Sequence, residues 1–186
     1  TYFNIFLNSL AKKSNLISED SGDIITTNSK GKIQDFFQYE IFDENYLESK
    51  YSVFEPTIIR RRTFDNNQLN WHSSYLDYVP YNIDSENISK KNFENWKNFL
   101  QKTSKSQYDS AYMGRFLALL QLFGDPHQIT GNNDKWVISK NKLYPVYRNE
   151  GGISKISNED ITNNLLFKNY YYSSSLEPYK KLFSDN

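Results

Sequence analysis

The residues best suited to chemistry lie in two polar stretches that flank a short apolar segment in this 186-residue sequence. Side-chain oxygens are available from Asp125 and Asn133 in the first stretch, and from Asn149 and Glu150 in the second. Hard divalent cations such as Mg²⁺ prefer oxygen ligands, and a metal ion held in this way can bind the phosphates of a nucleotide. The pattern therefore predicts a metal and phosphate site, provided that the two stretches converge.

The elements around these stretches could bring them together. An apolar run at residues 116–123 is typical of a buried helix end, and Gly124 predicts where the helix stops. Residues 135–138 and 142–147 have the pattern of a β-hairpin, closed by a polar turn at residues 139–141. The first polar stretch enters this hairpin and the second leaves it, so the hairpin would fix the spacing between their ligands.

Each candidate residue also has a purely structural interpretation. Asp125 would be a turn residue at the helix end, and His127 a hydrogen-bonding loop residue rather than an acid or base. Residues 132–134 form a natural turn, because Asn and Asp tolerate left-handed backbone. Glu150, which precedes two glycines, would be an exposed turn carboxylate. The sequence leaves both interpretations open at each position.

Composition excludes several classes of function. The 22 basic and 22 acidic residues cancel, so no overall field attracts nucleic acid, and we expect no nucleic-acid partner. No apolar run approaches the roughly 20 residues of a membrane-spanning helix. The absence of cysteine excludes disulfides, and the presence of only two histidines argues against a zinc site. The chain begins at Thr1 without a methionine, so we expect a processed chain or a fragment.

Aromatic residues are unusually frequent, with 15 Tyr, 13 Phe and 3 Trp. Packing in the core and at half-exposed positions is the first interpretation. Stacking of exposed rings on sugars or bases is the alternative. A long polar loop is expected at residues 64–84, and we interpret its rings first as packing between lobes, with a stacking platform as the alternative; they are Trp71, Tyr75, Tyr78 and Tyr81.

The first part of the chain predicts helices and strands in alternation. Apolar residues at helical spacing predict a helix over residues 1–14. A β-branched run at residues 23–27 and an alternating run at residues 33–42 predict a hairpin. Asp43 is a suitable N-cap for a short helix, and residues 57–63 predict a further strand.

Three consecutive arginines, residues 60–62, lie on this last strand. Side chains alternate along a strand, so Arg60 and Arg62 would share one face and Arg61 the other. We expect a solvated sheet edge, where arginines hinder aggregation. Phosphate binding is the alternative.

The second part of the chain predicts three helices besides the candidate hairpin. Ser89 is a suitable N-cap for the first, and Ser106 or Asp109 opens the second, which contains the apolar run before Gly124. Asn158 caps the third, and we expect the tyrosine-rich tail from Tyr170 onward to lie on the surface.

The ordered set of segments resembles the spore coat protein H (CotH-type) kinase-like family, whose members are relatives of the protein-kinase fold. The resemblance covers roughly residues 1–152. In that family an early helix, here YFNIFLNSLAKKSNL, precedes a hairpin. The second strand of that hairpin ends in a tyrosine and a glutamate before a short helix, here FFQYEIFDENYLES with Tyr39 and Glu40.

The second half of the resemblance covers the candidate site. The family has a buried helix, a D-x-H loop, an asparagine and an aromatic strand, here Asp125-Pro126-His127, Asn133 and Lys135-Trp136. A second strand and a proline then lead to a metal-binding aspartate, and LYPVYRNEGG occupies that place in this chain.

The resemblance implies a kinase that uses Mg²⁺ and ATP. Asp125 matches the catalytic base that accepts the proton of the attacking hydroxyl, and Asn133 matches the metal-binding asparagine of the catalytic loop. Glu40 lies in the stretch that adjoins the nucleotide base in the family, and the polar face of a strand is its other interpretation. Asn149 stands where the family has its metal-binding aspartate, with Glu150 beside it.

Two departures from the family bear on catalysis. A neutral amide at Asn149 binds Mg²⁺ more weakly than a carboxylate, so either Glu150 replaces the aspartate or the domain no longer catalyses. Kinase folds also hold the nucleotide phosphates with a lysine on a strand that precedes the early helix, and this chain begins at that helix. Another basic side chain would have to contact the nucleotide phosphates in this chain.

We therefore predict an α+β protein with a partial protein-kinase-like fold. Residues 1–84 would form a small antiparallel-sheet lobe, incomplete at its N-terminus, and residues 85–186 a helical lobe with the candidate loop and hairpin. The first functional hypothesis is an atypical kinase that transfers phosphoryl from ATP to a protein hydroxyl. The second is a catalytically dead structural or interaction module with a protein partner, in a larger cell-surface or secreted assembly. Glycan binding by the aromatic loop is the third.

Overall fold

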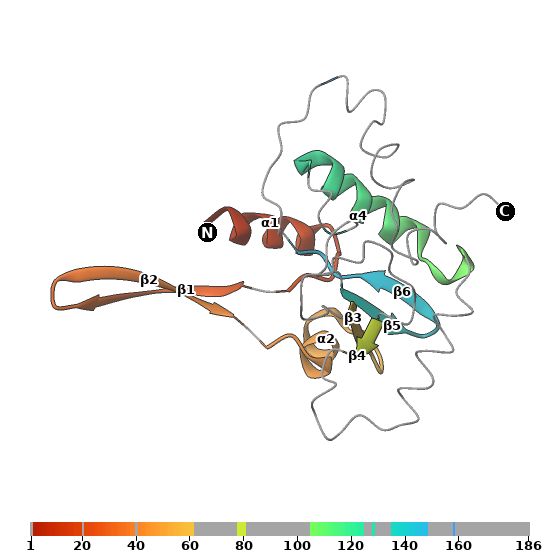
Figure 1. The fold of residues 1–186 in the computed structure, drawn as a ribbon, viewed down its shortest axis with the longest axis horizontal. Coiled ribbons are helices and arrows are strands. Elements are labelled where there is room, and N and C mark those ends of the chain that lie inside the picture. Colours follow the sequence, from red (N-terminus) through yellow and green to blue (C-terminus); the bar gives the residue numbers. More distant parts are fainter. Residues whose placement is uncertain are drawn as a thin grey trace, which may run out of the picture.

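Helices and two small antiparallel sheets make up the computed structural model, which confirms the predicted α+β class (Figure 1). The structure describes residues 2–19, 21–39, 41–61, 78–80, 105–124, 128, 135–148 and 158. The elements in chain order are α1 (Tyr2–Lys13), β1 (Ser21–Ser29), β2 (Lys32–Tyr39), α2 (Glu44–Tyr51), β3 (Thr57–Arg61), β4 (Tyr78–Pro80), the short 3₁₀ helix η2 (Lys105–Gln107), α4 (Ser110–Phe123), β5 (Lys135–Ser139) and β6 (Lys142–Pro145).

Helix α1 confirms the helix predicted at the start of the chain, and a left-handed residue ends it. Asn15 has φ 55°, and its N–H donates to the Lys12 carbonyl at 2.9 Å. The next N–H, that of Leu16, donates to the Ala11 carbonyl at 2.9 Å, and both of these residues are fully buried. This is the hydrogen-bond pattern that satisfies the last carbonyls of a helix and turns the chain sharply.

Strands β1 and β2 form the predicted hairpin, which projects away from the rest of the molecule (Figure 1). Its two-residue turn, Lys30 and Gly31, has positive φ at both positions, as the turn that matches strand twist requires. The second strand ends at Tyr39, so the prediction that it continues to residue 42 is wrong. Phe42 instead packs on Tyr46 of α2, with their ring centroids 5.5 Å apart.

Helix α2 begins where predicted. The Asp43 carboxylate accepts a hydrogen bond from the Tyr46 N–H at 2.8 Å, which satisfies one of the unpaired donors at the helix start. Phe42 directly precedes this cap. Its buried ring packs against α2, so Phe42 does not continue strand β2.

The second sheet has four strands in the order β4-β3-β5-β6, and all neighbours are antiparallel. Strand β3 has a neighbour on each side, so the interpretation of Arg60 and Arg61 as a solvated sheet edge is wrong. Strand β4 falls within the loop expected at residues 64–84, whose other residues lie outside the described part of the chain. The sheet combines strands from both sides of the boundary predicted at residue 84, and the division into lobes stays a prediction.

The hairpin of β5 and β6 confirms the predicted one, although its second strand ends at Pro145 and not at residue 147. Lys140 and Asn141 form its two-residue turn with φ 47° and 61°. Asn tolerates left-handed backbone, which favours such a turn. The Ser139 hydroxyl also donates to the Phe54 carbonyl at 2.6 Å, so the turn end of the hairpin is tied to the segment between α2 and β3.

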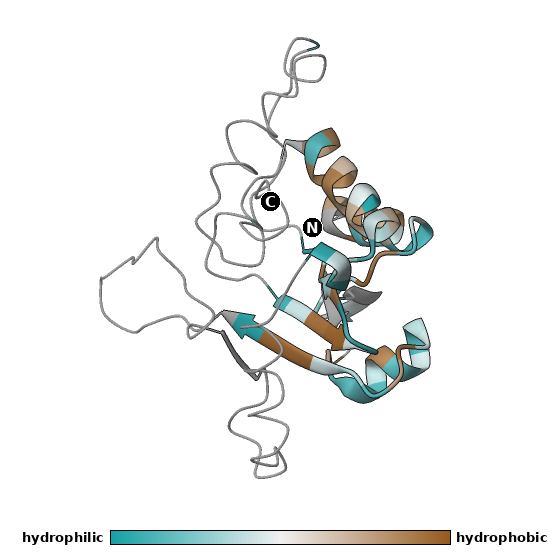
Figure 2. Cartoon of the chain, turned by 90° about the vertical axis from the view of Figure 1, so that its right-hand side faces the viewer, coloured by the Kyte–Doolittle hydropathy of each residue, from teal (hydrophilic) through white to brown (hydrophobic). Residues whose placement is uncertain are grey.

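Helix α4 has the predicted cap at each end. The Asp109 carboxylate accepts from the Tyr112 N–H at 2.8 Å, and Gly124 closes the helix with φ 60°. Apolar residues cover much of its length (Figure 2), and those predicted to lie inside are buried or, for Phe123, half-buried. The helices predicted to begin at Ser89 and at Asn158 lie outside the described residues, apart from Asn158 itself.

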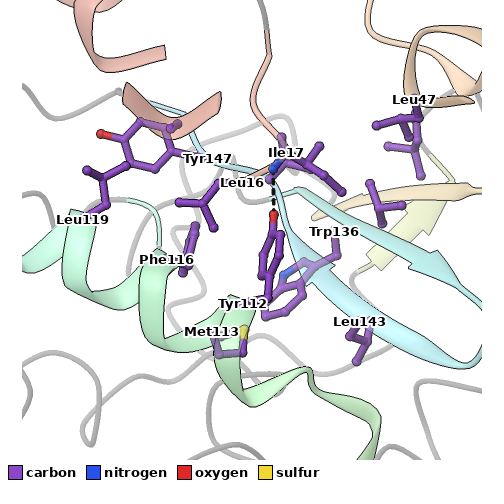
Figure 3. Packing of buried hydrophobic residues seen from close by; sticks show 14 of the residues in the cluster. Leu16, Ile17, Leu47, Tyr112, Met113, Phe116, Leu119, Trp136, Leu143 and Tyr147 are labelled. Carbon is purple, nitrogen blue, oxygen red and sulfur yellow. Dashed lines mark hydrogen bonds between the residues drawn. The ribbon is translucent and has the colours of Figure 1, made fainter. Parts of the chain in front are cut away.

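One hydrophobic core joins the two halves of the chain (Figure 3). Its largest fully buried side chains are Trp136, Tyr147 and Phe116, and they pack with Leu7 and Leu47 from the first half. Among the residues that the structure describes, no helix is long and apolar enough to cross a membrane.

Tyr112 connects three elements inside this core. Its hydroxyl accepts a hydrogen bond from the Ile17 N–H at 2.9 Å (Figure 3) and donates one to the Pro145 carbonyl at 2.8 Å. Helix α4, the end of β6 and the segment after α1 therefore meet at one phenol. Burial raises the pKa of Tyr112 far above its usual value near 10, because the phenolate would lose its hydration.

Replacing Tyr112 with Phe tests this connection. Both main-chain groups then remain buried without their partner, so we expect the free energy of unfolding to fall by about 1–3 kcal/mol. Tyr144→Phe is the control, because it removes a half-buried hydroxyl from the ring that stacks edge-on against Tyr112. Urea denaturation measures both, and equal losses for the two variants would contradict the assignment.

The raised pKa of Tyr112 also predicts a dependence on pH. The folded-state pKa lies above the unfolded one, so the stabilisation is complete below pH 10 and is lost as pH rises above it. We expect the stability advantage of the wild type over Tyr112→Phe to shrink by about 1 kcal/mol between pH 10 and 11, because the unfolded tyrosine is already half ionised at pH 10. An advantage that stays constant over this interval, measured by urea denaturation, would count against burial of the phenol.

Candidate functional site

The residues predicted to carry the chemistry lie outside the described part of the chain; they are Glu40, Asp125, His127, Asn133, Asn149 and Glu150. The structure does describe residues on either side of both polar stretches. Gly124 precedes the first stretch and Lys135 follows it, Gln128 lies within it, and Arg148 precedes the second stretch. These flanking residues fix where the chain enters and leaves the predicted site.

Gln128, in the first polar stretch, is bonded to the chain that directly precedes the second. Its side chain is buried, with 3% of its surface exposed. The amide nitrogen donates to the Val146 carbonyl, and the amide oxygen accepts from the Arg148 N–H at 3.0 Å. The C=O of one residue and the N–H two positions later lie on the same edge of an extended chain, so one amide side chain can satisfy both. A residue three positions after Asp125 is thereby bonded to the residue that precedes Asn149.

A carboxylate lies beside the same two chain ends. Glu19 contacts the Lys135 ammonium with Oε1 and the Arg148 Nε with Oε2, the latter at 2.7 Å. The three side chains are 22%, 8% and 29% exposed in the order Glu19, Lys135 and Arg148. Charge-assisted hydrogen bonds are stronger than neutral ones, and partial burial reduces their screening by salt. The carboxylate therefore links the start of β5 to the chain that follows β6.

Lys135 is the most buried member of this cluster. A buried ammonium is costly unless it is paired, and Glu19 provides the opposite charge. The Phe42 ring, whose centroid is 5.7 Å from Nζ, adds a cation–π contact. The main chain of Lys135 is also engaged, because its carbonyl accepts from the Val146 N–H at 2.9 Å.

Residues 16–19, which we call the connecting segment, hold Glu19 in place. The Ile17 carbonyl accepts from the Tyr147 N–H at 2.7 Å, and Ser18 forms a parallel bridge with Tyr147. The segment therefore runs beside the chain that leaves β6. Leu16, Ile17 and Ser18 are all buried, so the segment is fixed by the core immediately before Glu19.

Two tyrosines of α2 hold the other side of the connecting segment. The hydroxyls of Tyr46 and Tyr51 each donate to the Ser18 carbonyl at 3.2 Å. The Tyr51 hydroxyl also accepts from the Ser18 N–H at 3.0 Å and lies 3.1 Å from the Ser18 hydroxyl. Both main-chain groups of a fully buried residue are thus satisfied by side chains, which removes the penalty of burying them unpaired.

Sequence reasoning did not identify the residues that join the two stretches. Glu19 follows a short apolar run and belongs to a polar Ser-Glu-Asp sequence that is typical of a loop. Its partner Lys135 is 116 positions away, and no spacing rule relates them. Gln128 carries no signal either, because an amide that bonds main-chain groups needs no particular neighbours in sequence.

The described residues contain no group of three or more His, Cys, Asp or Glu side chains that could hold a metal ion. The predicted oxygen ligands do not belong to that part of the chain. No protein-family model, curated protein or solved structure matches this chain.

Replacing Gln128 with Leu tests the link between the two stretches. The change preserves most of the side-chain volume but removes the Gln128 amide from a buried carbonyl and a partly buried N–H, so we expect a loss of about 1–3 kcal/mol in the free energy of unfolding. Hydrogen exchange of the Arg148 amide should accelerate as well.

Gln34→Leu is the matched control, because Gln34 is exposed on the hairpin of β1 and β2. Urea denaturation and amide exchange should leave this variant close to wild type. Unchanged protection of the Arg148 amide in Gln128→Leu would show that the bond does not hold the two stretches together.

Proposed function

We propose that this chain is a divergent kinase-like domain that binds Mg²⁺ and ATP between the stretch after Gly124 and the stretch after Arg148. The observation that carries the proposal is a pair of hydrogen bonds: the Gln128 amide donates to the Val146 carbonyl and accepts from the Arg148 N–H. The predicted site requires the two stretches to meet. Gln128 belongs to the first stretch, and Val146 and Arg148 lie just before the second. The resemblance to the CotH-type family supplies the chemistry.

In the proposed mechanism Asp125 is the general base. Its carboxylate accepts the proton of a protein hydroxyl while the hydroxyl oxygen attacks the γ-phosphorus of ATP. The bond between that phosphorus and the oxygen bridging to the β-phosphate breaks, and ADP leaves with the bonding electrons. Glu40 would lie next to the nucleotide base.

The donor chemistry of the second group of residues fits Mg²⁺, which takes oxygen ligands. Asn133, Asn149 and Glu150 would hold the ion through two amide oxygens and one carboxylate. A bound Mg²⁺ neutralises the charge that develops on the phosphate oxygens. Glu150 is the single carboxylate in this set, so we assign to it the role that an aspartate has in the family.

A catalytically dead interaction module is the second candidate, and two observations favour it. Asn149 replaces the charged ligand of the family with a neutral amide. The hairpin of β1 and β2 projects from the molecule (Figure 1), and Ile33 on it is 72% exposed. A projecting ribbon with exposed edges suits the binding of a partner protein, in this case within a larger cell-surface or secreted assembly.

A thermal-shift measurement with Mg²⁺ and ATP separates the two candidates. Saturation at about 100 times the dissociation constant stabilises a protein by about 2.7 kcal/mol, so we expect the melting temperature to rise by about 5–10 °C. Glu150→Gln should reduce the Mg²⁺-dependent part of this rise. Asp125→Asn should retain the rise but lower phosphoryl transfer by about 10²–10⁴-fold, because it removes the base alone.

Glu48→Gln is the control for these variants, since Glu48 is an exposed carboxylate on α2. It should behave as wild type in both assays. A wild-type chain whose melting temperature does not respond to Mg²⁺ and ATP contradicts the kinase proposal and favours the interaction module. A response without phosphoryl transfer to any protein substrate indicates a domain that binds nucleotide but does not catalyse.

A further inference from the structure

The hairpin of β1 and β2 ends in an uncovered tip. Every residue from 28 to 34 is exposed, and the hairpin projects away from the other elements (Figure 1). In the part of the chain that the structure describes, no third strand pairs with β1 or β2. A ribbon of two strands is at best marginally stable in water, whereas three or more strands can be stable. The hairpin therefore gains stability when a further strand pairs with it.

The turn of the hairpin determines which main-chain groups face outward. Ser29 and Lys32 flank the two-residue turn, so they form the hydrogen-bonded pair that closes it. Hydrogen-bonded and non-hydrogen-bonded pairs alternate along an antiparallel ribbon, so the next pair, Asn28 and Ile33, is non-hydrogen-bonded. The N–H and C=O of Ile33 therefore point away from β1, and those of Asn28 point away from β2. Each edge offers main-chain donors and acceptors to a further strand.

The two edges differ in regularity. The register shifts between Ser21 and Ile24, where β1 contains one residue more than β2. An extra residue of this kind is a β-bulge, which bends its own strand and hinders further pairing at that edge. Strand β2 carries no extra residue and no proline. The edge that is open to a further strand is therefore the edge of β2.

Charge favours a second copy of this chain as the partner of β2. Lys30 and Lys32 make the tip basic, and both are exposed. The chain just beyond the other end of β2 is acidic, because Asp43 and Glu44 lie at the start of α2, where both are partly exposed. When two β2 strands pair antiparallel along their length, the tip of each hairpin lies at the base of the other. Each basic tip then meets an acidic stretch, and the two-fold symmetry repeats this contact.

Other features of the described residues agree with this arrangement. A parallel pairing would instead place two basic tips side by side, and like charges on neighbouring strands are destabilising. Ile41 lies between β2 and α2 and is 80% exposed, so the tip of a second copy would cover an apolar side chain there. The contact is the same patch on both copies, so it closes as a dimer and does not propagate into a fibre.

We propose that two copies of this chain associate through antiparallel pairing of their β2 strands. The product is one sheet in the order β1-β2-β2-β1, with a two-fold axis at its centre and the rest of each copy at opposite ends. The association does not involve the proposed Mg²⁺ and ATP site, so its presence or absence leaves the kinase proposal untouched.

Sedimentation equilibrium of the whole chain over a range of concentrations tests the proposal. We expect the wild type to change from monomer to dimer below about 100 µM. Ile33→Pro removes an outward N–H from β2 in both copies, and we expect it to weaken the dimer at least about tenfold. Asn28→Pro is the matched control, because it removes the outward N–H directly across the ribbon on the edge of β1. It should change the dimerisation constant less than about twofold, since that edge is not used.

Charge reversal at the tip tests the choice of partner. Replacing both Lys30 and Lys32 with Glu should weaken the dimer about tenfold at low salt, and added salt should weaken the wild-type dimer. Lys13→Glu combined with Lys105→Glu is the control, because it makes the same change in net charge at exposed sites away from the hairpin. Equal weakening by the two double variants would show that net charge, and not the tip, controls association, which overturns the proposed arrangement.

Cross-linking tests the direction of pairing, because the chain contains no cysteine of its own. A chain with Lys30→Cys and Ile41→Cys should form covalent dimers with a short bismaleimide, and each single variant should form few. The strand between these positions spans about 25 Å, too far for such a reagent to bridge within one copy. Efficient dimers from Lys30→Cys alone would place the two tips together and overturn the antiparallel arrangement.

Two further results would overturn the proposal outright. The first is a wild-type chain that remains monomeric up to about 100 µM, whether or not a strand of a different protein then binds the same edge. The second is equal weakening of the dimer by Ile33→Pro and Asn28→Pro, which would place the contact elsewhere.

Discussion

Buried main-chain groups that no sheet neighbour can satisfy determine how this molecule is assembled. The connecting segment crosses the core between α2 and α4, and tyrosine hydroxyls supply partners that its peptide groups need: Tyr46 and Tyr51 at Ser18, and Tyr112 at Ile17. Burying an unpaired peptide group costs as much free energy as burying several well-packed methylenes contributes. The fold therefore requires these hydroxyls. The abundance of tyrosine follows in part from this need, because a ring can pack in the core while its hydroxyl reaches the main chain.

The same contacts hold the chain in place next to the proposed site. Helix α1 ends in a sharp left-handed turn at Asn15, and the connecting segment then runs beside the chain that follows β6. The segment then places Glu19 between Lys135 and Arg148, while Gln128 bonds the chain on either side of Tyr147. Two independent sets of contacts, one ionic and one between amide groups, therefore converge on the same short stretch after β6. The proposed kinase chemistry depends on that convergence.

The sequence predicted the parts of the fold that local interactions decide. Asp43 and Asp109 cap helices because a carboxylate three positions before an unpaired N–H is sufficient, and Gly124 ends α4 because it adopts positive φ without strain. The turn at Lys140 and Asn141 is equally local. These features are determined within a few residues and need no knowledge of distant partners.

What could not be predicted depends on distant partners. The arginines of β3 look like an edge until β4 pairs on the other side, and the bond between Tyr112 and Ile17 joins residues 95 positions apart. The candidate site divides in the same way. Residue type and the family resemblance suggested Asp125 and its companions as ligands. The side chain of Gln128 instead bonds main-chain groups of Val146 and Arg148, and every residue possesses such groups.

The most direct test of the central claim uses Mn²⁺ in place of Mg²⁺ with a nitrogen-15-labelled chain. Bound Mn²⁺ broadens the amide signals of nearby residues. With ATP present, the account predicts broadening of the Gln128, Lys135 and Arg148 amides, while Ser29 at the tip of the projecting hairpin keeps its line width. Broadening at Ser29 with none at these three amides, or no broadening anywhere, would contradict the claim that the two stretches form one metal and nucleotide site.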